Sequence, residues 1–84
     1  MVNWQKVSFV VRSRHRQTLV RLLGEGPRTP SVLAKRLALS GSHTSQLLTG
    51  LETEEIVVCL TPNAVRGRLY SLTPLGKEIL GVLR

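Results

Sequence analysis

The chain has 84 residues and a formal net charge of +7, from 12 Lys and Arg against 5 Asp and Glu. This length supports one small domain, and the single cysteine, Cys59, excludes an internal disulfide. For a chain that is 42% hydrophobic, the excess of positive charge points to a polyanionic partner. Nucleic acid is the first candidate and an anionic membrane surface the second. No apolar run is long enough to cross a bilayer and no secretory signal pattern is present, so we expect a cytoplasmic protein without a membrane partner.

Enzymatic and metal chemistry find no support in the residue pattern. There is no aspartate, no Gly-rich phosphate loop and no nucleophile with a matching base. His15 and His43 lack cysteine or carboxylate neighbours at metal-ligand spacing, and Cys59 lies in an apolar run as a small hydrophobic residue. Three of the five acids, Glu52, Glu54 and Glu55, cluster at an expected solvated helix end. We therefore predict no catalytic site, no metal and no cofactor.

The first twelve residues form an arm whose structure the periodicity leaves open. Val7, Phe9 and Val11 alternate like a strand, whereas Trp4, Val7 and Val10 keep helical spacing. This much apolar bulk, including Trp4 and Phe9, has to be buried against the domain's own core or against a second subunit. Residues 3–12 can therefore be a helix or a strand.

Ser13 can cap a helix over residues 14–23, which Gly24 or Gly26 ends. We expect its buried stripe to contain Leu19, Leu22 and Leu23. Several arginines lie at its start and flank, including Arg14 and Arg16, and either a DNA contact or plain solvation could account for each of them.

Residues 29–54 predict a helix-turn-helix. Thr29 is a good N-cap, and Pro30 at the first helical position loses no hydrogen bond. A second helix can be capped by Ser40 or Ser42, with Gly41 permitting the change of direction between the two. Thr44, Leu48 and Leu51 would form its apolar face. Its opposite face is polar and mostly uncharged, and consists of Ser42, His43, Ser45, Gln46 and Thr49.

That polar face is typical of a helix that enters the major groove of DNA. A face meant only for solvent usually carries Lys and Glu, which are better helix formers than Ser, Thr and His. Gln can pair with adenine through two hydrogen bonds, and Ser or Thr can reach a base edge or a phosphate. An ordinary helical hairpin with a Ser/Thr-rich turn remains the plain alternative from these residues alone.

Residues 56–72 predict a two-stranded wing, which favours DNA binding over the plain hairpin. The β-branched run 56–60 reads as a buried strand, residues 61–67 as a turn and residues 68–72 as the returning strand. Arg66 and Arg68 lie at or beside the tip, where they could meet a phosphate or the minor groove. Thr73-Pro74 then opens a last helix to residue 83, with Leu75, Ile79, Val82 and Leu83 on its apolar side.

The elements together predict an α+β, mainly helical fold: a winged helix-turn-helix with a three-helix core, a two-stranded β-wing and a C-terminal helix. One domain then spans 1–84, with the arm at 1–12, the helix-turn-helix at 29–54, the wing at 56–72 and the last helix at 74–83. The dimer surface could lie on the arm around Trp4 and Phe9 or on the last helix around Ile79 and Leu83.

The stretch from Leu39 to Glu52, continuing to Ile56 and Val57, resembles the recognition helix and following strand of MarR- and ArsR-type winged-helix regulators. The segments 13–16 and 68–77 are similar to small archaeal members of that group. The resemblance implies a sequence-specific, double-stranded-DNA-binding regulator of transcription, usually a homodimer, and favours a short helix for the arm. The predicted DNA-contact set is Ser42, His43, Ser45, Gln46, Thr49, Arg66, Arg68, Arg14, Arg16 and Thr29.

The chain departs from this family's pattern at two positions. Glu55 stands where a glycine usually ends the recognition helix, so we expect that end to be built differently. Gln46 stands where an arginine is common, which should weaken phosphate attraction there. A nonspecific architectural DNA binder and a protein-interaction module are the alternative functions. The sequence names no operator and no effector ligand.

Overall fold

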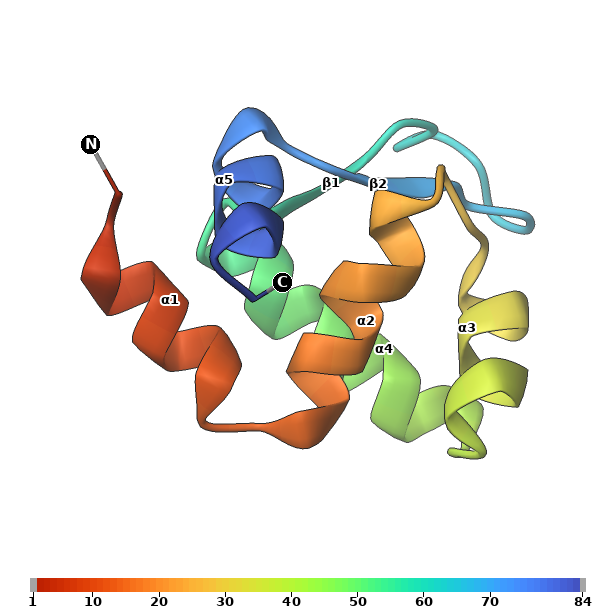
Figure 1. Ribbon diagram of the computed structural model, residues 1–84. Helices are drawn as coiled ribbons and strands as arrows, with labels where there is room; N and C mark the ends of the chain where they lie inside the picture. The colour runs from red at the N-terminus through yellow and green to blue at the C-terminus, as the bar shows by residue number, and fades with distance from the viewer. Residues whose placement is uncertain (1, 84) are drawn as a thin grey trace.

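The computed structural model describes residues 2–83, so the first and last residues of the predicted domain lie outside it. Figure 1 shows the winged helix-turn-helix that the sequence predicts. The elements are α1 (Trp4–Val11), α2 (Arg14–Gly24), α3 (Pro30–Leu37), α4 (Gly41–Thr53), β1 (Val57–Cys59), β2 (Tyr70–Leu72) and α5 (Pro74–Leu83). Helices α1 and α5 lie at one end of the molecule and α3 at the other, with α2 and α4 between them.

All five helices within residues 2–83 follow a polar side chain that accepts a hydrogen bond from a backbone N–H three residues on. For α5 this residue is Thr73, as predicted, which accepts from the Gly76 N–H at 3.0 Å. Ser13 and Thr29 cap α2 and α3 as predicted, and Asn3 caps α1. Of the two candidates for α4, Ser40 is the cap, accepting from the His43 N–H at 3.1 Å. Each such cap stabilises its helix by about 1 kcal/mol. These starts are local, and the sequence predicts them well.

The arm is a helix, which resolves the alternative that periodicity left open. Val7 and Val10 are buried and face the core, while Trp4 on the same helix is 66% exposed. Trp4 is therefore not buried against the domain's own core, and burial of its side chain against a second subunit stays a prediction. Lys6 also ties α1 to the end of α4 through an ion pair with Glu54 at 2.9 Å.

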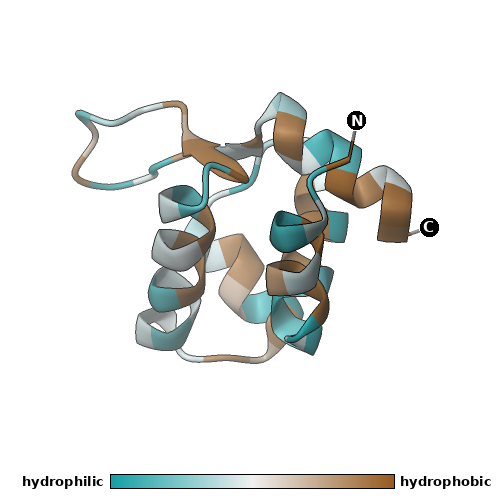
Figure 2. Cartoon of the chain, turned by 90° about the vertical axis from the view of Figure 1, so that its left-hand side faces the viewer, coloured by the Kyte–Doolittle hydropathy of each residue, from teal (hydrophilic) through white to brown (hydrophobic). Residues whose placement is uncertain are grey.

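Helices α2, α3, α4 and α5 each contribute leucine or isoleucine side chains to the core. Leu19, Leu33, Leu48, Leu51 and Ile79 are at most 1% exposed. In Figure 2 the hydrophobic segments turn toward the interior between the helices. The stripe predicted for α2 is buried, as is the apolar face predicted for α4.

Two non-glycine residues adopt the left-handed conformation at helix ends. Ala38 has a φ of 56° and makes the turn between α3 and α4, a role that the sequence had led us to expect of Gly41. Gly41 instead opens α4. Glu55 has a φ of 63°, so α4 ends with the backbone conformation that glycine would favour. The expectation of a differently built helix end is wrong: Glu55 takes up the strain itself.

The wing is shorter than predicted. Its antiparallel strands pair Val57 with Leu72 and Cys59 with Tyr70, three residues on each side instead of five. One backbone hydrogen bond lies beyond each end of this pairing: the Leu60 N–H donates to the Leu69 carbonyl oxygen at 2.7 Å, and the Thr73 N–H donates to the Ile56 carbonyl oxygen at 3.1 Å. Ile56 is lost to the strand because its N–H caps α4, donating to the Leu51 carbonyl oxygen at 2.9 Å.

The last helix buries most of the predicted face: Ile79 is in the core, and Leu75 and Leu83 pack against it. Ile79 and Leu80 are buried and Val82 is 37% exposed, whereas the sequence had placed Val82 on the apolar side. Gly76 is also buried. It packs so closely on the segment before β1 that a Cβ at this position would collide with the carbonyl oxygen of Ile56. This close approach of the backbone sets the rotation of α5. Since Ile79 is fully buried, it cannot belong to a surface that contacts a second subunit.

Candidate nucleic-acid interface

Helix α4 presents its polar face to solvent, as predicted. Thr44 is fully buried, and its hydroxyl donates a hydrogen bond to the Ser40 carbonyl oxygen at 2.9 Å. Because the Thr44 side of the helix faces the core, the opposite side faces solvent. The outward residues are all exposed: Ser42, His43, Ser45, Gln46 and Thr49. Because α3 packs against α4 from the other side, this face is free to meet a groove of DNA.

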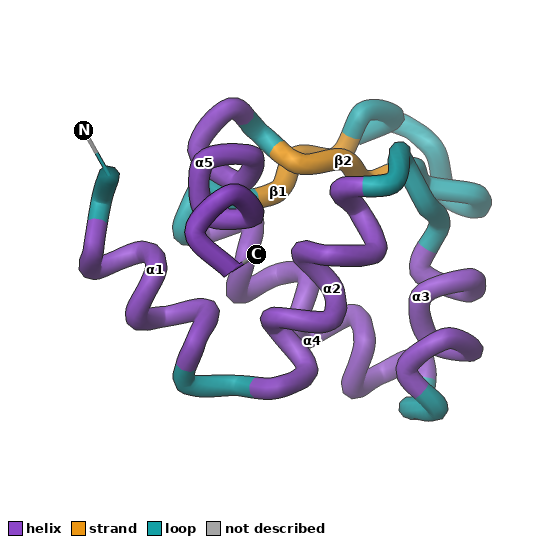
Figure 3. Tube along the Cα trace, in the orientation of Figure 1, coloured by secondary structure: helices purple, strands orange, loops and turns teal. Residues whose placement is uncertain are grey.

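A cleft of about 410 Å³ lies between α4, the start of α3 and the loop that joins β1 to β2, residues 60–69, here called the wing loop. Figure 3 shows the loop that joins the two strands extending above α3. Four of the predicted contact residues line the cleft, two from the helix-turn-helix and two from the wing: Thr29, Ser45, Arg66 and Arg68. The tertiary structure thus brings together residues that lie up to 39 positions apart in the chain (68 minus 29).

The two wing arginines differ in their surroundings. The guanidinium of Arg68 donates to the Pro62 carbonyl oxygen at 3.3 Å, which braces the loop. The Arg66 side chain is exposed and forms no hydrogen bond or ion pair with the rest of residues 2–83. Gly67 between them has a φ of 66°, a left-handed turn that directs both side chains to the cleft.

The wing is anchored to the helix-turn-helix by a contact that sequence analysis missed. Arg28 and Tyr70 exchange two backbone hydrogen bonds, of 3.0 and 2.9 Å, so the loop before α3 pairs with β2. Ser31, in the first turn of α3, also lines the cleft and was not among the predicted contacts. Its place two residues after the Thr29 cap, where helical N–H groups lack partners, is the signal that could have identified it.

At the start of α2, the two arginines predicted to contact DNA differ in their exposure to solvent. Arg14 is exposed, whereas Arg16 is half-buried, with its guanidinium 3.8 Å from the centre of the Phe9 ring. Arg16 also donates to the Phe9 carbonyl oxygen at 2.8 Å and so joins α2 to α1. Arg14 remains available to a ligand, while Arg16 is held by the domain itself.

Two titratable side chains of the wing, Cys59 and Tyr70, are buried. Cys59 is buried in β1. Burial raises the pKa of Tyr70, an effect that nearby Arg68 partly offsets. Across residues 2–83, no three His, Cys, Asp or Glu side chains are grouped to hold a metal ion. Over the same residues, no helix has the length and hydropathy needed to span a membrane.

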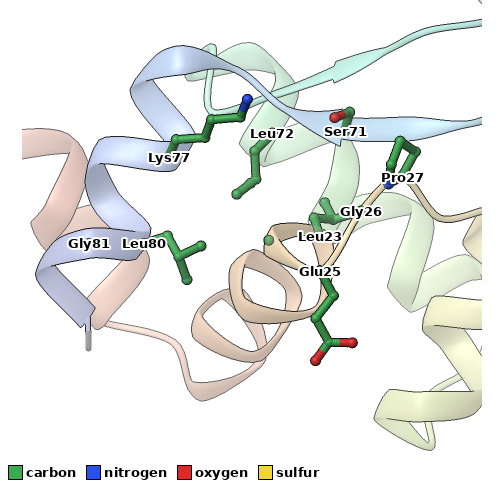
Figure 4. Close-up of a pocket in the computed structure, with 10 residues that line it drawn as sticks. Leu23, Glu25, Gly26, Pro27, Ser71, Leu72, Lys77, Leu80 and Gly81 are labelled. Carbon is green, nitrogen blue, oxygen red and sulfur yellow. The ribbon is translucent and has the colours of Figure 1, made fainter.

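A second hollow of about 450 Å³ lies between the end of α2, β2 and α5, away from the polar face of α4. In Figure 4, Leu23, Leu72 and Leu80 surround it, the Lys77 amine lies on the side of Ser71, and Glu25 points away. The sequence predicted no groove here, because its walls come from three separate elements.

Comparison with known proteins gives solved structures only, since no protein-family model and no curated protein matches the chain. The adhesin competence repressor AdcR from Streptococcus pyogenes superposes with a TM-score of 0.77 at 21% identity, over 84% of this chain and 53% of that one. Lactococcus lactis ZitR, solved in complex with DNA, gives 0.73 at 24% identity, over 80% and 47%. This chain therefore spans about half the length of these two proteins. At such identities the likeness shows the fold alone.

A structure described as a possible transcriptional regulator for arsenical resistance is more similar in sequence. It matches with a TM-score of 0.72 at 34% identity, over 88% of this chain and 75% of that one. These matches do not support the expected likeness to archaeal members in particular. Their TM-scores, from 0.72 to 0.77, show that the chain shares their fold.

Proposed function

The chain belongs to the MarR/ArsR-type winged-helix regulators, and on that premise we propose that it is a cytoplasmic transcriptional regulator that binds double-stranded DNA sequence-specifically. The observation that carries the proposal is the exposed, polar and mostly uncharged face of α4 beside the arginine-lined cleft of the wing. ZitR, a protein of the same fold, has been solved with DNA.

In this proposal the two parts of the surface do different work. The side chains on α4 read base edges in the major groove, with Gln46 suited to two hydrogen bonds to adenine. The cleft receives a backbone phosphate between Arg66, Arg68 and the N–H groups at the start of α3, where the helix dipole favours negative charge. Arg14, next to His15 in the first turn of α2, adds a phosphate contact near the start of α4. Its neighbour Arg16 contributes indirectly by holding α2 in place.

We further propose that the chain acts as a homodimer on a pseudo-palindromic site. A two-fold pair of recognition helices would then enter successive major grooves about 34 Å apart. Of the two surfaces that the sequence suggested, the outer face of α1 is favoured, because Trp4 is 66% and Val11 48% exposed. An exposed tryptophan on an 84-residue chain is the kind of anchor that protein interfaces use.

The test is binding of this chain to a random-sequence duplex library against competitor DNA, over a salt series, with the mass in solution measured alongside. A dimer that selects a two-fold-symmetric motif would support the proposal. Steep salt dependence without selection would favour the architectural role, and absence of binding at low salt would favour a protein partner.

Two variants distinguish base recognition by the polar face of α4 from phosphate binding in the cleft. Gln46→Ala should relax the preference at one base pair by about 1–3 kcal/mol with the salt slope unchanged. Arg66→Ala should weaken binding to all sequences alike and lower the slope of log K against log[salt] by about 0.9 per protomer, one phosphate contact. Equal loss of affinity on every sequence in both variants would contradict these assignments.

A further inference from the structure

The start of α4 contacts the start of α2 through two histidines. The rings of His15 and His43 lie edge to face, with centroids 5.7 Å apart and planes at 82°. This separation and angle are those that aromatic pairs prefer. His15 lies in the first turn of α2 and His43 in the first turn of α4, 28 positions further along the chain (43 minus 15).

His43 is distinguished from the other side chains on the polar face of α4 by this contact. In the part of the chain that the structure describes, no hydrogen bond or aromatic contact joins another element to the side chains of Ser42, Ser45, Gln46 or Thr49. Free side chains must be ordered when they bind, and that ordering lowers affinity. His43 has already lost part of this freedom.

The helix that carries His15 is itself anchored. Ser13 caps α2 by accepting from the Arg16 N–H at 3.3 Å. The guanidinium of Arg16 is fixed on Phe9 of α1 by the 2.8 Å hydrogen bond and the ring contact described above. A continuous set of contacts thus runs from α1 through Arg16 and the first turn of α2 to the ring of His43.

We infer that His15 is a positioning residue for DNA recognition: its ring holds the His43 imidazole in one orientation, in which a ring N–H or nitrogen meets a base at the start of the recognition helix. The inference rests on the proposed function. An imidazole offers both a donor and an acceptor, so fixing its orientation decides which of the two is presented to the groove. His15 itself needs no contact with DNA.

The experiment compares the motifs that wild type, His43→Ala, His15→Ala, His15→Phe and the double alanine variant select from a duplex library. His43→Ala should remove the preference at one position of each half-site. His15→Ala should weaken the preference at that same position by about 2- to 10-fold and have no further effect once His43 is alanine. His15→Phe keeps an edge-to-face partner and should restore the preference. Ser42→Ala, an outward neighbour without such a contact, should combine additively with His15→Ala.

A second measurement needs no DNA. In the free protein, removal of the His15 ring should shift the His43 ring-proton NMR signals, while thermal unfolding reports whether α2 stays folded. Unchanged His43 signals, or a motif that is unaltered by His43→Ala, would overturn the inference. So would a His15→Ala effect that persists when His43 is alanine. A wild-type protein that selects no motif would instead refute the proposed function.

Discussion

Replacing Glu55 with glycine should stabilise the protein. Glu55 follows α4 with a φ of 63°, and two backbone hydrogen bonds of 2.9 Å hold that turn, from Glu55 to Glu52 and from Ile56 to Leu51. A residue with a Cβ pays about 1–2 kcal/mol in this conformation, and glycine escapes that cost. The Glu55 side chain is exposed, and its contact with Thr73 is made by its backbone oxygen, which glycine keeps.

Glycine also makes the unfolded chain more flexible, and this entropic effect lowers the gain in stability by about 0.5–1 kcal/mol. The net increase in the free energy of unfolding should therefore lie between about 0 and 1.5 kcal/mol, with a midpoint of about 0.75 kcal/mol. For a domain of this size the midpoint value raises Tm by about 3–6 °C. Urea unfolding of the wild type and the variant, analysed with a shared m-value, would measure it.

Glu55→Ala is the matched control. It removes the same carboxylate but keeps the Cβ, so it should show no comparable gain. If the alanine variant is stabilised as much as the glycine variant, the effect comes from the charge in this basic protein and the argument from backbone strain is refuted.

Three further predictions concern packing, helix anchoring and pH. Gly76→Ala should lose about 1–3 kcal/mol in urea unfolding, because its Cβ would collide with a backbone oxygen, whereas Gly81→Ala, with open space around it, should be tolerated. Arg16→Ala should lower Tm by detaching α1, while Arg14→Ala should leave Tm unchanged and weaken only DNA binding. Burial raises the pKa of Tyr70 above 10.0, so stability should be full below that pH and fall as pH rises through the folded-state value. Tyr70→Phe should abolish that fall, and a fall of equal size in the variant would refute the assignment.

Local chemistry explains what could be predicted from the sequence. The caps Ser13 and Thr29 act within three residues, and the helical spacing of Leu48 and Leu51 marks a buried face whatever lies against it. The polar face of α4 follows from the same spacing. The order of helices and strands, the winged-helix fold and the exposed candidates on α4 were therefore predictable from the residues and their resemblance to a family.

The tertiary structure alone decided features that depend on partners distant in the chain. The arm became a helix because Val7 and Val10 meet the core, and α5 turned Leu80 inward because Gly76 packs on the backbone beside Ile56. Arg14 and Arg16 look alike in sequence, yet only Arg16 finds the Phe9 ring. The cleft beneath the wing and the His15–His43 contact arise in the same way, since each is formed by elements that only folding brings together. Periodicity reports which face of an element is apolar, but not which side chains from elsewhere will meet it.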